Sequence, residues 1–248
     1  MMLSEPIIGP IRSEKFRTRG KKIGRIETLS DAVFAFSVSL LVASLEVPQT
    51  FSELYPVMKG ALPFFATVAF LFMLWYKQYS FFRKYGINDF KTILLNLIYL
   101  AVVLFYLYPM KFLFSLLLSW FTGISFFPRA LDKLVITDQQ FPRLVILYSV
   151  GYFAIWILLY LMYSRALRLA RELQLDKYEV LYTKKERRGT LLNAMIGIIG
   201  GLIAWMDIPW LSGLCYLVMI PSVGVFNEVL FKRQVRKQVV TQGTDFQK

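Results

Sequence analysis

The sequence contains no histidine and only one cysteine, Cys215. Without imidazole there are no histidine metal ligands, no Ser-His or Cys-His dyads and no histidine proton relays. A single cysteine excludes an intrachain disulfide and a cysteine zinc cluster. The sequence also lacks a glycine-rich phosphate loop, a nucleophile elbow and a paired-carboxylate site. We therefore expect neither an enzyme nor a resident cofactor.

Charge is scarce as well. Only 18% of the 248 residues are Asp, Glu, Lys or Arg, whereas 56% are hydrophobic and 17% are aromatic. Soluble domains average roughly 45–50% apolar residues even when glycine is included. The surplus of apolar side chains and the shortage of charge indicate a protein whose solvent is a lipid bilayer.

Long hydrophobic runs supply the secondary structure. A bilayer core about 30 Å thick requires roughly 20 apolar residues in a helix. The runs are continuous rather than alternating, which excludes strands. We predict an all-α polytopic membrane protein with six spanning helices, at about residues 31–47, 57–82, 92–110, 144–163, 190–206 and 208–231.

The distribution of Lys and Arg decides whether a further apolar segment, residues 112–127, spans the membrane. With six spans and a cytoplasmic N-terminus, most of the 29 Lys and Arg residues lie on the inner side, as the positive-inside tendency requires. A seventh span would move the basic residues between positions 165 and 188 to the outer side. We therefore expect 112–127 to form an outer interfacial or re-entrant helix, with both termini cytoplasmic and the protein in the cell (inner) membrane.

The same assignment divides the chain. Residues 1–26 are expected to be a basic cytoplasmic segment, residues 27–231 the six-helix domain, and residues 232–248 a disordered cytoplasmic tail. Residues 165–188 are predicted to be a helix extension and a turn. The net charge of +13 is explained by basic residues that face anionic lipid, Arg165, Arg168 and Arg171 among them, so no nucleic acid partner is expected.

Polar residues mark the beginning of the first span. An unpaired carboxylate such as Asp31 costs about 3 kcal/mol if it lies deep in the bilayer. Arg25 is about 240° away around the same helix, so it cannot neutralise Asp31 there. Alternatively, Ser30 and Asp31 only cap the helix in the headgroup region, and the spacing leaves both readings open. Partners from other spans would be Lys77, Gln78 or Asn96.

Deeper in the first span, four residues at i, i+3, i+4 and i+7 share one helical face: Phe36, Ser39, Leu40 and Ala43. Small residues at every fourth position, starting at Ala35, let helices approach closely, so this face is explained by ordinary packing. The alternative is a symmetry axis at which hydroxyls and rings surround a narrow conduit. Ser37 lies on another face and is expected to pack inside the subunit.

The sequence from Arg25 to Asp31 reads Arg-Ile-Glu-Thr-Leu-Ser-Asp, and residues 32–42 read Ala-Val-Phe-Ala-Phe-Ser-Val-Ser-Leu-Leu-Val. This stretch resembles the first-helix signature of the transmembrane protein 175 family of potassium channels in its bacterial form. That signature has Phe where this chain has Leu29. Weaker matches are Trp75, Asn96 and Pro109.

The resemblance implies a homotetramer whose four first helices line a central pore, without the filter loop of ordinary potassium channels. Phe36 and Leu40 would form the constriction, Ser39 a hydroxyl layer near which K⁺ is coordinated, and Ala43 a deeper lining position. It also implies a polar network at the cytoplasmic mouth, made by Arg25, Ser30, Asp31, Gln78 and Asn96.

The chain departs from the family pattern at two site positions. Phe36 replaces an isoleucine, and Gln78 lies where the family has histidine. Phe34 offers another register for the constriction if the helix is rotated.

The function expected from the resemblance is passive, potassium-selective conduction, with copies of the chain, membrane lipid and permeant K⁺ as partners. A secondary transporter is an alternative, with Pro109 and Pro221 as candidate helix breaks. A non-transporting membrane scaffold is another, since ridges of small residues are sufficient for helix packing.

Overall fold

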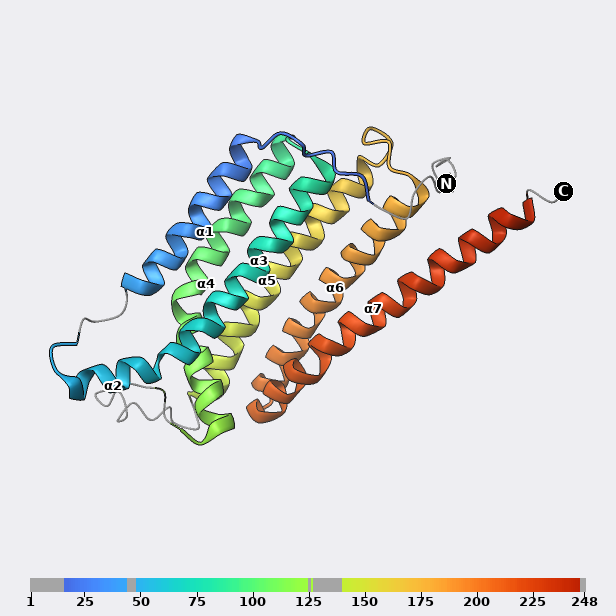
Figure 1. Cartoon of the computed structure of the whole chain (residues 1–248). Helices are drawn as coiled ribbons and strands as arrows, with labels where there is room; N and C mark the ends of the chain where they lie inside the picture. Colours follow the sequence, from blue (N-terminus) through green and yellow to red (C-terminus); the bar gives the residue numbers. More distant parts are fainter. Residues whose placement is uncertain (1–15, 44–47, 125, 127–139, 246–248) are drawn as a thin grey trace.

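The structure of the chain is a computed structural model that describes residues 16–43, 48–124, 126 and 140–245. Within these residues the secondary structure is entirely helical, which confirms the all-α prediction (Figure 1). The helices are α1 (Arg25–Ala43), α2 (Phe51–Lys59), α3 (Ala61–Tyr85), α4 (Phe90–Thr122), α5 (Phe141–Arg168), α6 (Lys177–Trp205) and α7 (Pro209–Asp245).

Five stretches of the described residues are helical, long enough and apolar enough to cross a membrane. They are Arg25–Ala43, Val57–Tyr85, Phe90–Leu107, Phe141–Arg168 and Lys177–Trp205. The chain is therefore a multi-pass membrane protein. The sixth predicted span, residues 208–231, lies in α7, where the side chains are only partly described, and it stays a prediction. The end of the first predicted span, residues 44–47, lies outside the described residues.

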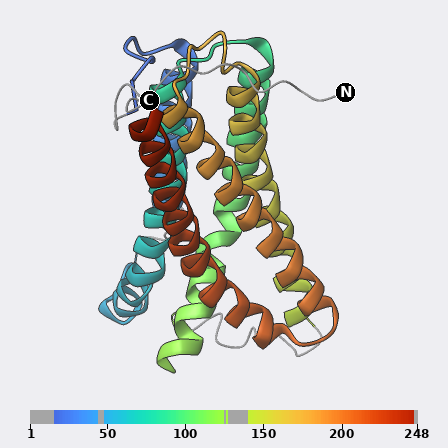
Figure 2. The same cartoon turned by 90° about the vertical axis from the view of Figure 1, so that its right-hand side faces the viewer.

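The prediction of a separate interfacial or re-entrant helix at residues 112–127 is wrong for the part that is described. α4 runs without a break from Phe90 to Thr122, so residues 112–122 extend the third helix. Pro109 lies inside this helix, and a proline bends a helix where the surrounding turns stay hydrogen-bonded. The ribbon changes direction in its lower half (Figure 2). Gly123 closes the helix as a left-handed cap with φ 67°.

Two other boundaries differ from the predictions. The second predicted span begins in the last residues of α2, changes direction at Gly60 and continues through α3 (Figure 1). The expected disordered tail is also wrong for residues 232–245, because α7 stays helical to Asp245. A run of residues without proline after Pro221 lets the helix continue past the apolar region.

The predicted helix extension and turn between residues 165 and 188 is confirmed. α5 ends at Arg168, and α6 begins at Lys177 behind a reciprocal capping box, in which Asp176 and Glu179 each accept the other's backbone N–H. Arg165 is not a lipid-facing residue, since it pairs with Asp89 at 3.0 Å, whereas Arg168 and Arg171 are exposed.

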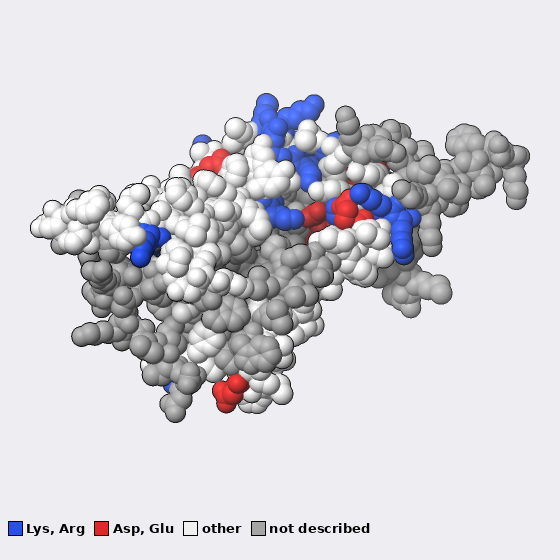
Figure 3. Space-filling model, turned by 60° about the horizontal axis from the view of Figure 1, so that its bottom comes forward, with Lys and Arg blue, Asp and Glu red and all other residues white. Residues whose placement is uncertain are grey.

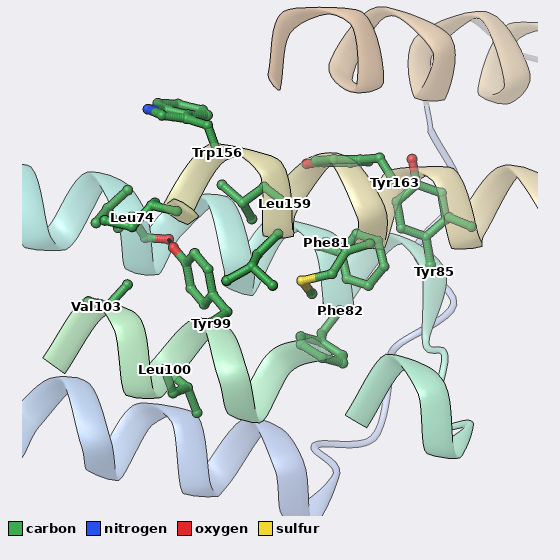
Figure 4. Packing of buried hydrophobic residues seen from close by; sticks show 14 of the residues in the cluster. Leu74, Phe81, Phe82, Tyr85, Tyr99, Leu100, Val103, Trp156, Leu159 and Tyr163 are labelled. Atoms are coloured by element: carbon green, nitrogen blue, oxygen red, sulfur yellow. Dashed lines mark hydrogen bonds between the residues drawn. The ribbon is translucent and has the colours of Figure 1, made fainter. Parts of the chain in front are cut away.

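Large aromatic and leucine side chains from α3, α4 and α5 form the core. Figure 4 shows them interleaved, with Phe81 and Tyr85 from α3, Tyr99 from α4, and Leu159 and Tyr163 from α5. α1 packs on α3 and α4, and the α6–α7 pair packs on α5. The start of α1, the α3–α4 connection and the α5–α6 turn therefore lie at one end of the bundle (Figure 1).

Candidate ion pathway along the first helix

α1 has one face buried by its own subunit. The buried side chains are Ser30, Phe34, Ser37 and Leu41. Ser37 is 1% exposed and donates its hydroxyl to the Val33 carbonyl at 2.7 Å, so it is a packing residue, as predicted. Phe34 is 4% exposed and belongs to the hydrophobic core. The register that would place Phe34 at a pore axis is therefore not the one in this fold.

The opposite face of α1 is left uncovered. Phe36 is 57% exposed and Leu40 is 44% exposed, and Ser39 and Ala43 are exposed beside them. The Ser39 hydroxyl donates to the Ala35 carbonyl at 3.2 Å, which leaves its oxygen lone pairs free to accept. Packing within the subunit does not use these four residues, which we call the α1 stripe (Phe36, Ser39, Leu40 and Ala43).

Three of the five predicted mouth residues form a buried hydrogen-bonded chain. The Asn96 amide donates to the Ser30 hydroxyl at 3.0 Å, and the Gln78 amide donates to the Asn96 side-chain oxygen at 3.1 Å. Ser30 in turn donates to the Ile26 carbonyl at 2.7 Å. These side chains are at most 1% exposed, so the chain ties α1 to α4 and α3 through neutral groups only.

Asp31 and Arg25 lie apart from this chain. The Trp75 indole N–H donates to an Asp31 carboxylate oxygen at 2.8 Å, and the indole stacks on Tyr79 with centroids 5.2 Å apart. The Arg25 side chain is exposed and makes no hydrogen bond or ion pair with the residues that the structure describes. Lys77, another candidate partner of Asp31, instead pairs with Glu186 at 3.2 Å.

Two contacts at this end of the bundle were missed by sequence reasoning. Trp75 was noted only as a motif match, although an indole is a donor that can reach a carboxylate at the same depth. Asp89 was overlooked in the α3–α4 connection. Burial raises the pKa of Asp89, but hydrogen bonds from Thr92 and Arg165 outweigh it and hold the pKa below its usual value.

On the face seen in Figure 3, most of the described charged side chains gather in one region, with isolated ones at the left and lower edges. This separation suits a molecule with a lipid-facing belt and a polar end. Within the described residues, no group of three or more Cys, Asp or Glu side chains lies where it could hold a metal ion.

Comparison with known proteins identifies the family. Residues 25–106 match the family model described as endosomal/lysosomal potassium channel TMEM175. A protein of Marivirga tractuosa named potassium channel is 37% identical over 241 residues, which cover 94% of this chain and 96% of the relative. This chain belongs to the TMEM175 family. The family and the all-α membrane fold expected from the sequence are thus confirmed.

Solved structures agree with this membership. The TMEM175-family chain matches a variant of the potassium channel MtTMEM175, crystallised with a nanobody fusion protein, at a TM-score of 0.78 and 38% identity, over 88% of this chain and 97% of that one. A lysosomal potassium-selective channel TMEM175 homolog from Chamaesiphon minutus matches at a TM-score of 0.52 and 22% identity, over 82% and 97% of the two chains, and supports the fold alone. Every predicted site residue falls within the segment that matches the family model.

Proposed function

We propose that this chain is a potassium channel that conducts passively through a central pathway lined by α1 from four identical subunits. The observation that carries the proposal is the uncovered α1 stripe, which lies inside the segment matched by the family model. The 37% identity to a potassium channel along nearly the whole chain supports the same function.

The proposed pathway assigns a task to each residue of the stripe. Phe36 and Leu40 form a hydrophobic constriction that closes by steric contact or dewetting, and the Ser39 hydroxyls supply oxygen ligands to a partly dehydrated K⁺. Phe36 also offers ring faces that attract a cation when the rings rotate aside. Ala43, one turn beyond Ser39, leaves the pathway wider there.

The polar residues at the start of α1 hold this pathway in place. The buried chain of Ser30, Asn96 and Gln78 fixes the rotation of α1 against α3 and α4. Asp31 is oriented by Trp75, and Arg25 is free to meet a neighbouring subunit at the mouth.

The proposal includes the topology expected from the sequence. Six helices span the cell (inner) membrane, with residues 1–26 and 232–248 in the cytoplasm and residues 27–231 forming the channel domain. The alternative of a secondary transporter requires helices broken near the membrane centre. α4 continues through Pro109 and α7 through Pro221, which favours a channel.

Flux measurements test the function. Purified protein in vesicles should release K⁺ faster than Na⁺, with no imposed proton gradient, and should elute as an assembly of four times the 28.9 kDa subunit mass. Flux that strictly requires a proton gradient would reject the channel in favour of a transporter. A monomer without ion flux would support the scaffold.

A further inference from the structure

An extended segment precedes the pore helix and crosses the end of the bundle. We call residues 16–24 the N-terminal strap. Figure 1 shows it, in dark blue, running from beside α6 across the ends of α3 and α4 to the start of α1. The sequence placed these basic residues against lipid headgroups, but two of the strap's arginines, the half-exposed Arg17 and the more buried Arg19, pair with a carboxylate of α6.

Arg17 and Arg19 both form ion pairs with one buried carboxylate. Glu179, in the first turn of α6, has a side chain that is 0% exposed. Its oxygens accept from Arg19 Nη2 at 2.6 Å, from Arg17 Nη2 at 3.1 Å and from the Arg17 backbone N–H at 2.9 Å. Charge-assisted, forked contacts of this kind fix geometry as well as charge. We call this arrangement of Arg17, Arg19 and Glu179 the latch.

The same arginines also cap the α5–α6 turn. Arg19 Nε donates to the Leu173 carbonyl at 2.8 Å, and Arg17 Nη2 donates to the Gln174 carbonyl at 2.8 Å. Burial raises the pKa of Glu179, but the hydrogen bonds from Arg19 and Arg17 outweigh it and lower the pKa to about 2. The Glu179 carboxylate is therefore ionised at neutral pH, as its two ion pairs with arginine require.

The middle of the strap is clamped to the end of α3. The Gly20 backbone N–H donates to the Arg83 carbonyl at 3.1 Å, and the Arg83 guanidinium donates to the Gly20 carbonyl at 2.7 Å. A Cβ at Gly20 would lie 2.5 Å from the Phe82 carbonyl oxygen, so only glycine permits this approach. Phe16 covers the outer end of the strap by packing edge-on against Tyr85 and Tyr182.

The latch is close to the pore helix along the chain. Only residues 21–24 separate Gly20 from Arg25, where α1 begins, and the Gly24 N–H donates to Glu27 of α1 at 2.7 Å. At no more than about 3.6 Å per residue, a linker this short limits how far the strap can move without also moving α1.

We propose that Glu179 is a positioning residue for conduction, which acts through Arg17 and Arg19 to hold α1 with its stripe toward the pore axis. This inference rests on the proposed channel function. With the latch closed, the buried face of α1 stays packed and the four Phe36 rings stay at the constriction. With the latch open, the start of α1 is held only by the Gly20 contacts with α3 and by the buried Ser30 hydrogen bond to Asn96. The rings then leave the axis for a larger fraction of the time.

Single-channel recording in planar bilayers tests the proposal, because it separates gating from the number of folded channels. In Glu179→Gln we expect an open probability at least about 3-fold above wild type, with unitary conductance and K⁺/Na⁺ selectivity unchanged. The double variant Arg17→Gln/Arg19→Gln should reproduce this gain. Glu179→Asp, which keeps the charge on a shorter side chain, should restore part of the wild-type behaviour.

Glu172→Gln is the matched control. Glu172 lies in the same α5–α6 turn, is exposed and has no ion pair with the described residues, so its open probability should equal that of wild type. A Glu179→Gln channel with wild-type open probability overturns the proposal, even if fewer channels are recovered.

If Glu179→Gln does not assemble, Arg17→Lys/Arg19→Lys decides the question. This variant keeps both charges and loses only the forked hydrogen bonds. An unchanged open probability in that variant overturns the proposal, and an increase supports it. Absence of K⁺ current in wild type would instead reject the channel function itself.

Discussion

The two faces of α1 use the same residue types for opposite purposes. Phe34 and Ser37 are buried against α3 and α4, whereas Phe36 and Ser39, each two residues further along, are exposed. Composition and hydropathy therefore do not distinguish the face that builds the subunit from the face proposed to line the pore. What distinguishes them is their place on the helix relative to the neighbours of α1.

The largest effect should come from exchanging the two phenylalanines for alanine. Phe34→Ala removes a ring from a packed core, so we expect the free energy of unfolding to fall by about 3–5 kcal/mol. Phe36→Ala should change it by less than about 1 kcal/mol, because this ring has no core contacts within the subunit. Denaturant unfolding in detergent measures both values, and equal losses would contradict the division of α1 into two faces.

Phe36→Ala should also raise basal K⁺ conductance in vesicles, because it removes bulk from the proposed constriction. Conductance that stays at the wild-type value would move the constriction to another residue, with Leu40 the next candidate on the stripe.

The second test concerns the neutral hydrogen-bonded chain on the buried face. Asn96→Leu deletes its central member, which leaves the buried Gln78 amide without its acceptor and Ser30 with only its bond to the Ile26 carbonyl. An unsatisfied buried polar group costs about 1–3 kcal/mol, and we expect a loss of stability in that range. Asn88→Ala, at an exposed asparagine of the α3–α4 connection, is the control and should have little effect. A similar loss of stability in both variants would show that the hydrogen-bonded chain of Ser30, Asn96 and Gln78 does not stabilise the fold.

The two serines provide a smaller but more specific comparison. Ser39→Ala should lower K⁺/Na⁺ selectivity several-fold without destabilising the protein, because its hydroxyl is proposed to face the ion. Ser37→Ala should leave selectivity unchanged, because that hydroxyl is buried and bonded to its own helix. Reversal potentials under bi-ionic conditions measure the ratio. A loss of selectivity in Ser37→Ala alone would mean that α1 is rotated from the proposed orientation.

The sequence was sufficient for the helical class, for five of the apolar spans and for the family, because long apolar runs and one dense motif carry that information locally. The same periodicity correctly separated Ser37 from Ser39. Helix ends were less predictable. Pro109 was a candidate helix break, yet it lies within α4, which continues to Thr122. A local pattern does not show whether the neighbouring turns remain hydrogen-bonded.

Long-range pairs between charged residues were not predictable at all. Arg17 and Arg19 are separated from Glu179 by about 160 residues, and nothing in a basic N-terminal run distinguishes arginines that enter the protein from those that face lipid. Arg165 was misassigned for the same reason, since its partner Asp89 lies on a different connection. Such pairs exist only once the ends of several helices have been brought together.

The smallest expected effect is a pH dependence that separates the neutral face of α1 from the ion pairs at the helix ends. The pKa of Asp89 is lower in the folded protein than its usual value, so its contribution to stability is present above the usual pKa and is lost as the pH falls through the folded pKa. Asp89→Asn should therefore lower the thermal midpoint near pH 7, and the difference from wild type should shrink in strong acid. The lower thermal midpoint caused by Asn96→Leu should persist over that pH range, because no titratable group takes part in the hydrogen-bonded chain of Ser30, Asn96 and Gln78. If the losses in thermal midpoint caused by Asp89→Asn and by Asn96→Leu both disappeared in acid, α1 would be held by charge and not by neutral hydrogen bonds.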